Sequence, residues 1–174
     1  MALRQILTEP NQILREKSLF VEKVDEDLQK LMDDMLETMY AAPGIGLAAI
    51  QIGIPKRVIV LDIASKDGPK NPMFFINPEI IEKSENYFTY EEGCLSVPGQ
   101  FAEIDRPDKC HIKYLDYYGL PKEIKAEGML ATCMQHEIDH LEGILFIDYL
   151  SKLKKSMIIK KLSKQKKAIE RIVV

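Results

Sequence analysis

The sequence MLATCMQHEIDHLEG (129–143) places two histidines four residues apart and a glutamate directly after the first. Its apolar residues recur at helical spacing and Gly143 is a typical residue to end a helix, so the segment is expected to be helical. Residues four apart lie on the same face of a helix, so His136 and His140 can bind one metal ion with Glu137 beside it. The alternative is an exposed helix with two unrelated histidines. The apolar neighbours oppose it, because they imply burial, where unpaired imidazoles are costly.

Two histidines do not complete a catalytic metal site, which usually has three protein ligands and one open position. Phe146 stands where the long metzincin pattern requires a ligand. Cys133 is seven residues from His140, about 10.5 Å along a helix, and is expected to be a core or pocket residue. Cys94, in the turn-rich EEGCLSVPG, is the remaining candidate, with ordinary packing as the alternative. A His2Cys set suits Zn(II), Fe(II), Co(II) or Ni(II) rather than magnesium or calcium.

The rest of the chain predicts an α+β fold. A helix with a single apolar stripe is expected from the N-cap Asp25 to Pro43-Gly44. Segments 57–64 and 73–83 are expected strands, and 110–128 is an expected hairpin that bends at Tyr118-Gly119. Strands clustered in the middle, with helices at either side and no βαβ alternation, favour α+β architecture in one domain, residues 1–174.

The bulk composition is that of an ordinary globular protein, with 174 residues, 46% apolar content and a net charge of −3. No apolar run approaches the roughly 20 residues of a membrane-spanning helix, and no secretory signal is visible. Three cysteines make no plausible disulfide framework, and Cys110 and His111 are expected to be structural. These features predict a cytoplasmic location and give no indication of DNA binding.

The last 25 residues, 150–174, hold nine Lys or Arg and one Glu, so they carry +8 while residues 1–149 carry −11. Apolar residues on one side predict an amphipathic helix that packs on the body with its lysines outward. The alternative is a basic face for RNA phosphates or an anionic membrane surface.

A glycine-rich segment, PGIGLAAIQIG (43–53), formally matches the dinucleotide fingerprint GxGxxG/A. The fingerprint requires a strand before the glycines, whereas here a helix precedes them, so that interpretation is rejected. The segment instead predicts a close approach of the backbone to a ligand, with Gln51 as a side-chain amide donor. A simple loop that ends the helix is the alternative.

Three motifs, GIGLAAIQ (44–51), EGCLS (92–96) and QHEIDH (135–140), occur in that order. In a chain of this length they resemble the peptide deformylase family, and each motif matches the family pattern without a departure. The resemblance extends over most of the chain, and the basic C-terminal helix resembles the bacterial class. It implies mixed or antiparallel β-sheets around a central HExxH helix, with an N-terminal and a C-terminal helix. The implied reaction removes the N-formyl group from the N-terminal methionine of new polypeptides and releases formate.

The resemblance also implies which residues hold the metal. Cys94, His136 and His140 would bind one divalent ion, natively Fe(II), with Zn(II), Ni(II) or Co(II) able to take its place. Glu92 and Asp139 are the expected partners that orient the imidazoles.

The same resemblance implies roles around the metal. Glu137 would be the general base and acid, and Gln51 and the backbone N–H of Leu95 would bind the developing oxyanion. The implied substrate-binding residues are Gly44, Ile45, Gly46, Gly93, Met129, Thr132 and Cys133. The expected partners are N-formylmethionyl nascent peptides and, through the basic C-terminal helix, the ribosome.

Two other functions fit part of the pattern. A metalloprotease would cut internal peptide bonds of unformylated peptides. A structural zinc domain with an RNA-binding tail would need a fourth protein ligand, for which neither Cys110 nor His111 is well placed.

Overall fold

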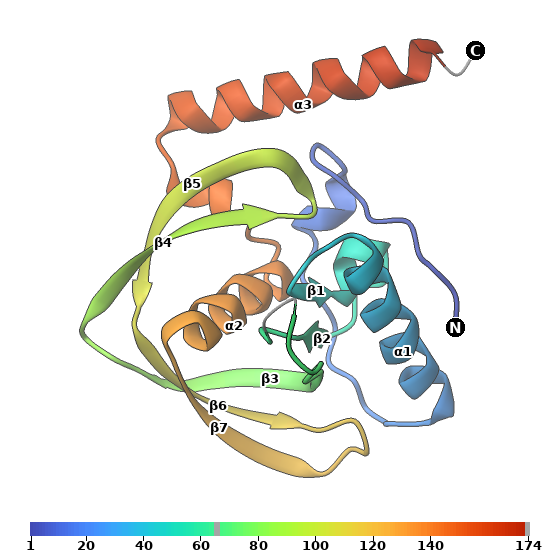
Figure 1. Cartoon of the computed structure of the whole chain (residues 1–174), viewed down its shortest axis with the longest axis vertical. Coiled ribbons are helices and arrows are strands. Elements are labelled where there is room, and N and C mark those ends of the chain that lie inside the picture. Colours follow the sequence, from blue (N-terminus) through green and yellow to red (C-terminus); the bar gives the residue numbers. More distant parts are fainter. Residues whose placement is uncertain (65–66, 173–174) are drawn as a thin grey trace.

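The HExxH helix lies at the centre of the fold, between two antiparallel sheets (Figure 1). The computed structural model describes residues 1–64 and 67–172. The strand order of the larger sheet is β1-β2-β3-β6-β7, and β4 and β5 form a separate two-stranded ribbon. The helices are α1 (Glu26–Ala41), α2 (Gly128–Leu141) and α3 (Lys152–Ile172). The strands are β1 (Gly46–Ala48), β2 (Val58–Leu61), β3 (Met73–Lys83), β4 (Tyr87–Cys94), β5 (Val97–Pro107), β6 (Lys109–Leu115) and β7 (Pro121–Glu127). Short 3-10 helices occupy Gln12–Arg15, Ala49–Ile52 and Phe146–Tyr149.

Strand β2 is buried on both faces because a helix packs on each side of the sheet. Ile59 and Leu61 point into the cluster that contains the apolar face of α2. Val58 and Val60 point the other way, into the cluster that contains the apolar stripe of α1. This alternation follows from the two-residue period of a strand. Helix α2 is therefore fixed in the core.

The expected α+β fold is confirmed, and so are the helix after Asp25, the strand 73–83 and the hairpin around Tyr118-Gly119. The interpretation of 91–99 as irregular is wrong, because β4 continues to Cys94 and β5 begins at Val97. The register shifts between Gly93 and Cys94, which is a bulge. Segment 91–99 can contain glycine and proline and still form strands, because both strands of this two-stranded ribbon are edge strands.

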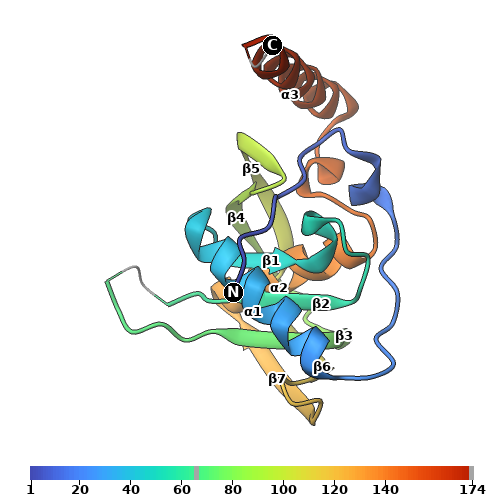
Figure 2. The same cartoon turned by 90° about the vertical axis from the view of Figure 1, so that its right-hand side faces the viewer.

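Helix α3 lies outside the body in both views (Figures 1 and 2). Leu162 is its buried residue, and Ile158 and Ile159 pack with it on the cluster around Phe146. The expected packing of the whole apolar side is wrong, because Leu153, Met157 and Ile169 are exposed. At about 100° per residue, positions 153 and 157 lie about 180° and 140° around the helix from Leu162. Residues 173–174 of the expected helix fall outside the described part of the chain.

Among the described residues, no helix combines the length and the apolar character that crossing a membrane requires.

The N-cap of α1 is a testable source of stability. The Asp25 carboxylate accepts a hydrogen bond from the Leu28 backbone N–H at 2.9 Å. Asp25→Ala should lower the free energy of unfolding by about 1 kcal/mol, measured by urea denaturation, because it leaves this donor without a partner. Asp25→Asn is the matched control and should retain most of the stability. Equal stability of the two variants would contradict the capping role.

Candidate active site

Three potential metal ligands converge where the end of β4 meets α2. The Sγ atom of Cys94 and one ring nitrogen each of His136 and His140 all lie within 4.8 Å of one another. Sγ is 3.3 Å from Nε2 of His140. Ligands of one tetrahedral ion lie about 3.5 Å apart, since metal–ligand bonds are about 2.0–2.3 Å long. The three side chains therefore already stand close to the spacing that one ion requires.

The two histidines are prepared for metal binding in different ways. The Nδ1 atom of His136 is 2.8 Å from the Glu92 carboxylate, which leaves Nε2 free to face an ion. His140 has no exposed surface, and burial, together with the positive charge of His136 and Arg106, lowers its pKa well below the usual value. A neutral imidazole is the form that binds a metal. Burial lowers the pKa of His136, but its contacts with Cys94 and Glu92 outweigh this effect and raise it well above the usual value, so an ion that binds would take the place of a proton there. The donor set of two imidazoles and one thiol fits a divalent transition ion.

Glu92 is held as a carboxylate by a buried ion pair. Arg106 donates to it through Nε at 2.7 Å and through Nη2 at 3.0 Å. Burial raises the pKa of Glu92, but the hydrogen bonds from His136 and Arg106 outweigh this effect and lower it. The expectation for Glu92 is confirmed. Asp139 was expected to orient an imidazole, but it accepts from Arg106 Nη1 at 2.8 Å and from the Tyr149 hydroxyl at 2.7 Å instead. Asp139 is therefore linked to His136 through Arg106 and Glu92.

The Glu137 carboxylate is buried beside the ligands and is only partly paired. Burial raises its pKa to about 7, in the range where a carboxylate can both accept and return a proton near neutral pH. Its Oε2 atom has no hydrogen-bond partner among the described residues. A Cβ atom built on Gly46 would lie 2.5 Å from Oε1. The absence of a side chain at Gly46 therefore makes room for this carboxylate.

The Gln51 amide is held in one orientation. Its Oε1 atom accepts from the Ala48 backbone N–H at 2.9 Å, and its Nε2 donates to the Ser96 hydroxyl at 3.0 Å. Nε2 also lies 3.6 Å from the Cys94 sulfur, and the Ser96 backbone N–H reaches the same sulfur at 3.4 Å. These two N–H groups approach the sulfur from the Gln51 side chain and from the Ser96 backbone, so they fix its position at the end of β4.

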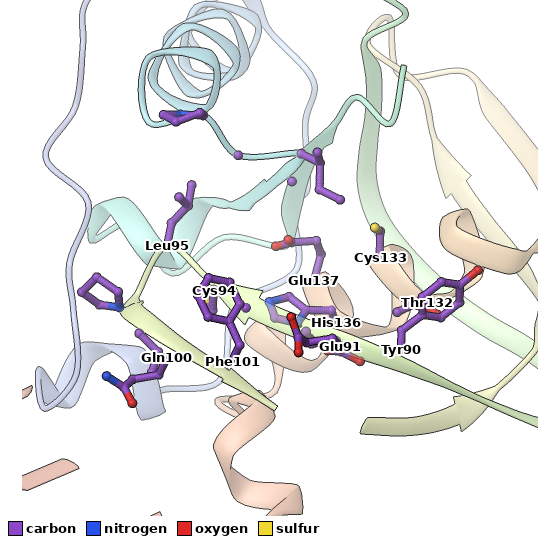
Figure 3. A pocket seen from close by; sticks show the side chains of 18 of the residues that line it. Tyr90, Glu91, Cys94, Leu95, Gln100, Phe101, Thr132, Cys133, His136 and Glu137 are labelled. Atoms are coloured by element: carbon purple, nitrogen blue, oxygen red, sulfur yellow. Dashed lines mark hydrogen bonds and ion pairs between the residues drawn. The ribbon is translucent and has the colours of Figure 1, made fainter. Parts of the chain in front are cut away.

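A cavity of about 470 Å³ opens onto this cluster, and we call it the catalytic cavity. In Figure 3, Thr132, Cys133, His136 and Glu137 rise from α2, while Tyr90, Glu91 and Cys94 come from β4. Burial raises the pKa of Cys133 to about 12, so its thiol is neutral and suits an apolar wall. Every expected substrate-binding residue lines the cavity: Gly44, Ile45, Gly46, Gly93, Met129, Thr132 and Cys133. Gln51, Leu95 and Glu137 line it as well.

Comparison with known proteins identifies the family. The family model for polypeptide deformylase matches residues 3–156. The chain belongs to the peptide deformylase family. The peptide deformylase of Pelagibacter ubique is 63% identical over the full length of both chains. The crystal structure of the Ehrlichia chaffeensis peptide deformylase has a TM-score of 0.91 at 44% identity and covers 96% of this chain and 98% of that one. The crystal structure of a peptide deformylase from Legionella pneumophila has a TM-score of 0.90 at 46% identity and covers 98% of this chain and 99% of that one.

The resemblance of the three motifs is thus confirmed, and a peptide deformylase is a hydrolase that removes formyl groups from nascent peptides. The structural zinc domain loses its support, because the described residues offer three clustered metal ligands and no fourth. The alternative of a metalloprotease also loses its support, because the matching family model is that of polypeptide deformylase.

Sequence reasoning missed Arg106, Ser96 and Tyr149 in this deformylase site. Each acts through another residue of the cluster: Arg106 and Tyr149 through their carboxylate partners, Ser96 through Gln51 and Cys94. No spacing pattern identifies such partners, because they come from different elements. The sequence holds one weak indication of Arg106: it is the single basic residue in the acidic segment EIDRPD (103–108).

The Glu92 carboxylate gives a prediction for metal affinity. Glu92→Gln should weaken metal binding about 10- to 100-fold, because the neutral amide no longer holds the charge-assisted bonds to His136 and Arg106. Competitive chelator titration measures the effect. Glu91→Gln, at the exposed neighbouring carboxylate, is the matched control and should bind metal as the parent does. Equal affinity of the two variants would contradict the orienting role of Glu92.

Proposed function

We propose that this deformylase hydrolyses the formyl amide of N-formylmethionyl polypeptides with one divalent ion bound by Cys94, His136 and His140. Fe(II) is the proposed native ion, and Zn(II), Ni(II) or Co(II) also fit a His2Cys set. The observation that carries the proposal is the convergence of these three ligands beside Glu137 in the wall of a cavity.

The bound ion would act as a Lewis acid on the formyl oxygen and would acidify the attacking water. Glu137 takes one proton from that water while the water oxygen forms a bond to the formyl carbon. Glu137 then returns the proton to the methionine nitrogen as the carbon–nitrogen bond breaks. The products are formate and a free amino terminus. The raised pKa of Glu137 supports this double role, since the carboxyl group gains and loses a proton at similar cost.

Gln51 and Leu95 are proposed to stabilise the negative charge that develops on the formyl oxygen. The Gln51 Nε2 atom already points to the Cys94 sulfur, and Leu95 follows Cys94 in the hairpin turn. The Gln51 amide is held by its hydrogen bonds to Ala48 and Ser96 before the substrate binds. One such preorganised donor contributes about 3–4 kcal/mol to the stabilisation of a transition state.

The substrate is proposed to bind as an added strand. Strand β1 is an edge of the larger sheet and begins at Gly46, in the wall of the catalytic cavity. Ile45 and Gly93 would flank the peptide backbone on its two sides. Met129, Thr132 and Cys133 would surround the methionine side chain, because they line the part of the cavity that α2 provides.

We also propose that residues 1–174 act as one deformylase domain in the cytoplasm, where three free thiols remain reduced. Leu162 of α3 shares a core cluster with Val97 of β5 and Phe146, which supports one unit.

The roles of the ligands and of Glu137 can be separated by mutation. Glu137→Ala should retain the metal but lower formate release from formyl-Met-Ala by at least about 100-fold, because only the proton carrier is removed. An unformylated peptide should remain uncut. Activity within tenfold of the parent would contradict the role of Glu137.

Cysteine variants are the controls for this measurement. Elemental analysis should find the metal lost or changed in Cys94→Ser, whereas Cys133→Ser should keep it. Normal metal content in Cys94→Ser would contradict the proposed ligand set.

We propose in addition that the lysines of α3 bind ribosomal RNA close to the emerging chain. The support is the charge of α3, with nine basic residues and one glutamate between 152 and 172. Co-sedimentation with ribosomes should weaken steeply as salt rises, because phosphate contacts release counterions. Lys166→Glu combined with Lys167→Glu should weaken binding further. Absent or salt-insensitive binding would contradict this role.

A further inference from the structure

A second groove lies between β5 and α3, and we call it the α3 groove. Its volume is about 620 Å³, and residues 100–103 of β5 form one wall. The other wall is one face of α3, with Lys154, Met157, Ile158 and Lys161. These four residues follow the i, i+3, i+4, i+7 spacing that places side chains on a single helix face. In both Figures 1 and 2, α3 passes beside β5 without lying flat on it.

The α3 groove joins the catalytic cavity through two residues of β5. Gln100 and Phe101 line both spaces. Phe101 is 66% exposed, and its ring covers Gly93 so closely that a Cβ atom there would lie 2.6 Å from it. In Figure 3, Gln100 lies toward the Leu95 end of the catalytic cavity, away from Tyr90 and Thr132. A chain that leaves this end meets an apolar ring and then the groove.

The chemistry of the α3 groove is apolar in the middle and mostly basic at the rim. Phe101, Met157 and Ile158 supply the apolar surface. Lys154 and Lys161 are both exposed, and Glu103 is the acidic residue that faces them across the groove. The groove therefore suits an extended peptide with apolar side chains and favours acidic over basic neighbours. RNA would leave the apolar surface without a partner, and the direct connection to the catalytic cavity favours the substrate over a second copy of the chain.

We propose that the substrate segment downstream of the formylmethionine crosses Phe101 and binds in the α3 groove. Its apolar side chains pack on Met157 and Ile158, and its acidic side chains pair with Lys154 and Lys161. The inference rests on the proposed function, because a polypeptide substrate continues beyond the few residues that the catalytic cavity holds. The groove thereby makes the enzyme selective for residues that lie outside the catalytic cavity.

Substrates of two lengths test the proposal. Formyl-Met-Ala reaches only the catalytic cavity, whereas two octapeptides with identical first halves end in Leu-Asp-Leu-Asp or Leu-Lys-Leu-Lys. The acidic octapeptide should have a kcat/KM about threefold or more above the basic one at low salt, as expected for exposed ion pairs, with a smaller ratio at high salt. Equal values for the two octapeptides would overturn the proposal.

Matched charge reversals locate the effect. Lys154→Glu with Lys161→Glu should invert the preference between the octapeptides and leave formyl-Met-Ala hydrolysis unchanged. Lys166→Glu with Lys167→Glu makes the same change of charge on exposed residues outside the groove and should keep the parental preference. An equal shift in both double variants would show a long-range field and overturn the proposal.

Two further outcomes separate this proposal from its alternatives. If the groove variants change self-association in sedimentation velocity but not octapeptide selectivity, the groove is an interface between copies and the proposal fails. If the parent protein releases no formate from formyl-Met-Ala, the proposed function itself fails, and the groove loses its assigned ligand with it.

Discussion

The buried ion pair between Glu92 and Arg106 is the contact on which the site depends. It joins β4 to β5, and through His136 and Asp139 it joins both strands to α2. Glu92 and Arg106 are both almost fully buried, so neither charge can turn to water. Removal of one partner from such a pair typically costs about 3–5 kcal/mol, because the other charge is left uncompensated. The pair thus couples the position of His136 to the position of the ribbon that carries Cys94.

The central helix contributes to the core and to the site with opposite faces. Ala131, Met134 and Ile138 pack toward the larger sheet, whereas His136 and His140 turn to the ribbon. Tight packing on the first face limits how far the second face can move. A shift of the sheet would therefore move both imidazoles together. The rigid framework explains how the two imidazoles and the Cys94 sulfur can stand so close together, although Cys94 comes from the end of a hairpin strand.

Sequence reasoning succeeded where the pattern is local. The helix after Asp25, the hairpin at Tyr118-Gly119 and the spacing of His136 and His140 all depend on neighbours within one element. It failed for the ribbon, because Gly93 and Pro98 are typical of turns and only the pairing of β4 with β5 holds them in strands. It also failed for the exposed side of α3, since amphipathic spacing shows which residues share a face but not whether a partner covers that face.

Strand β1 is an edge of the larger sheet whose short length limits pairing with other chains. It is three residues long and lies at the end of the larger sheet. A long, flat edge strand invites pairing with other chains, whereas a short one offers few hydrogen bonds. Here the edge also begins in the wall of the catalytic cavity, beside Ile45 and Gly46. In the proposed binding mode, an extended substrate that enters the cavity would pair with this edge and would present its first amide to Glu137. The same short strand would then serve both substrate recognition and protection from aggregation.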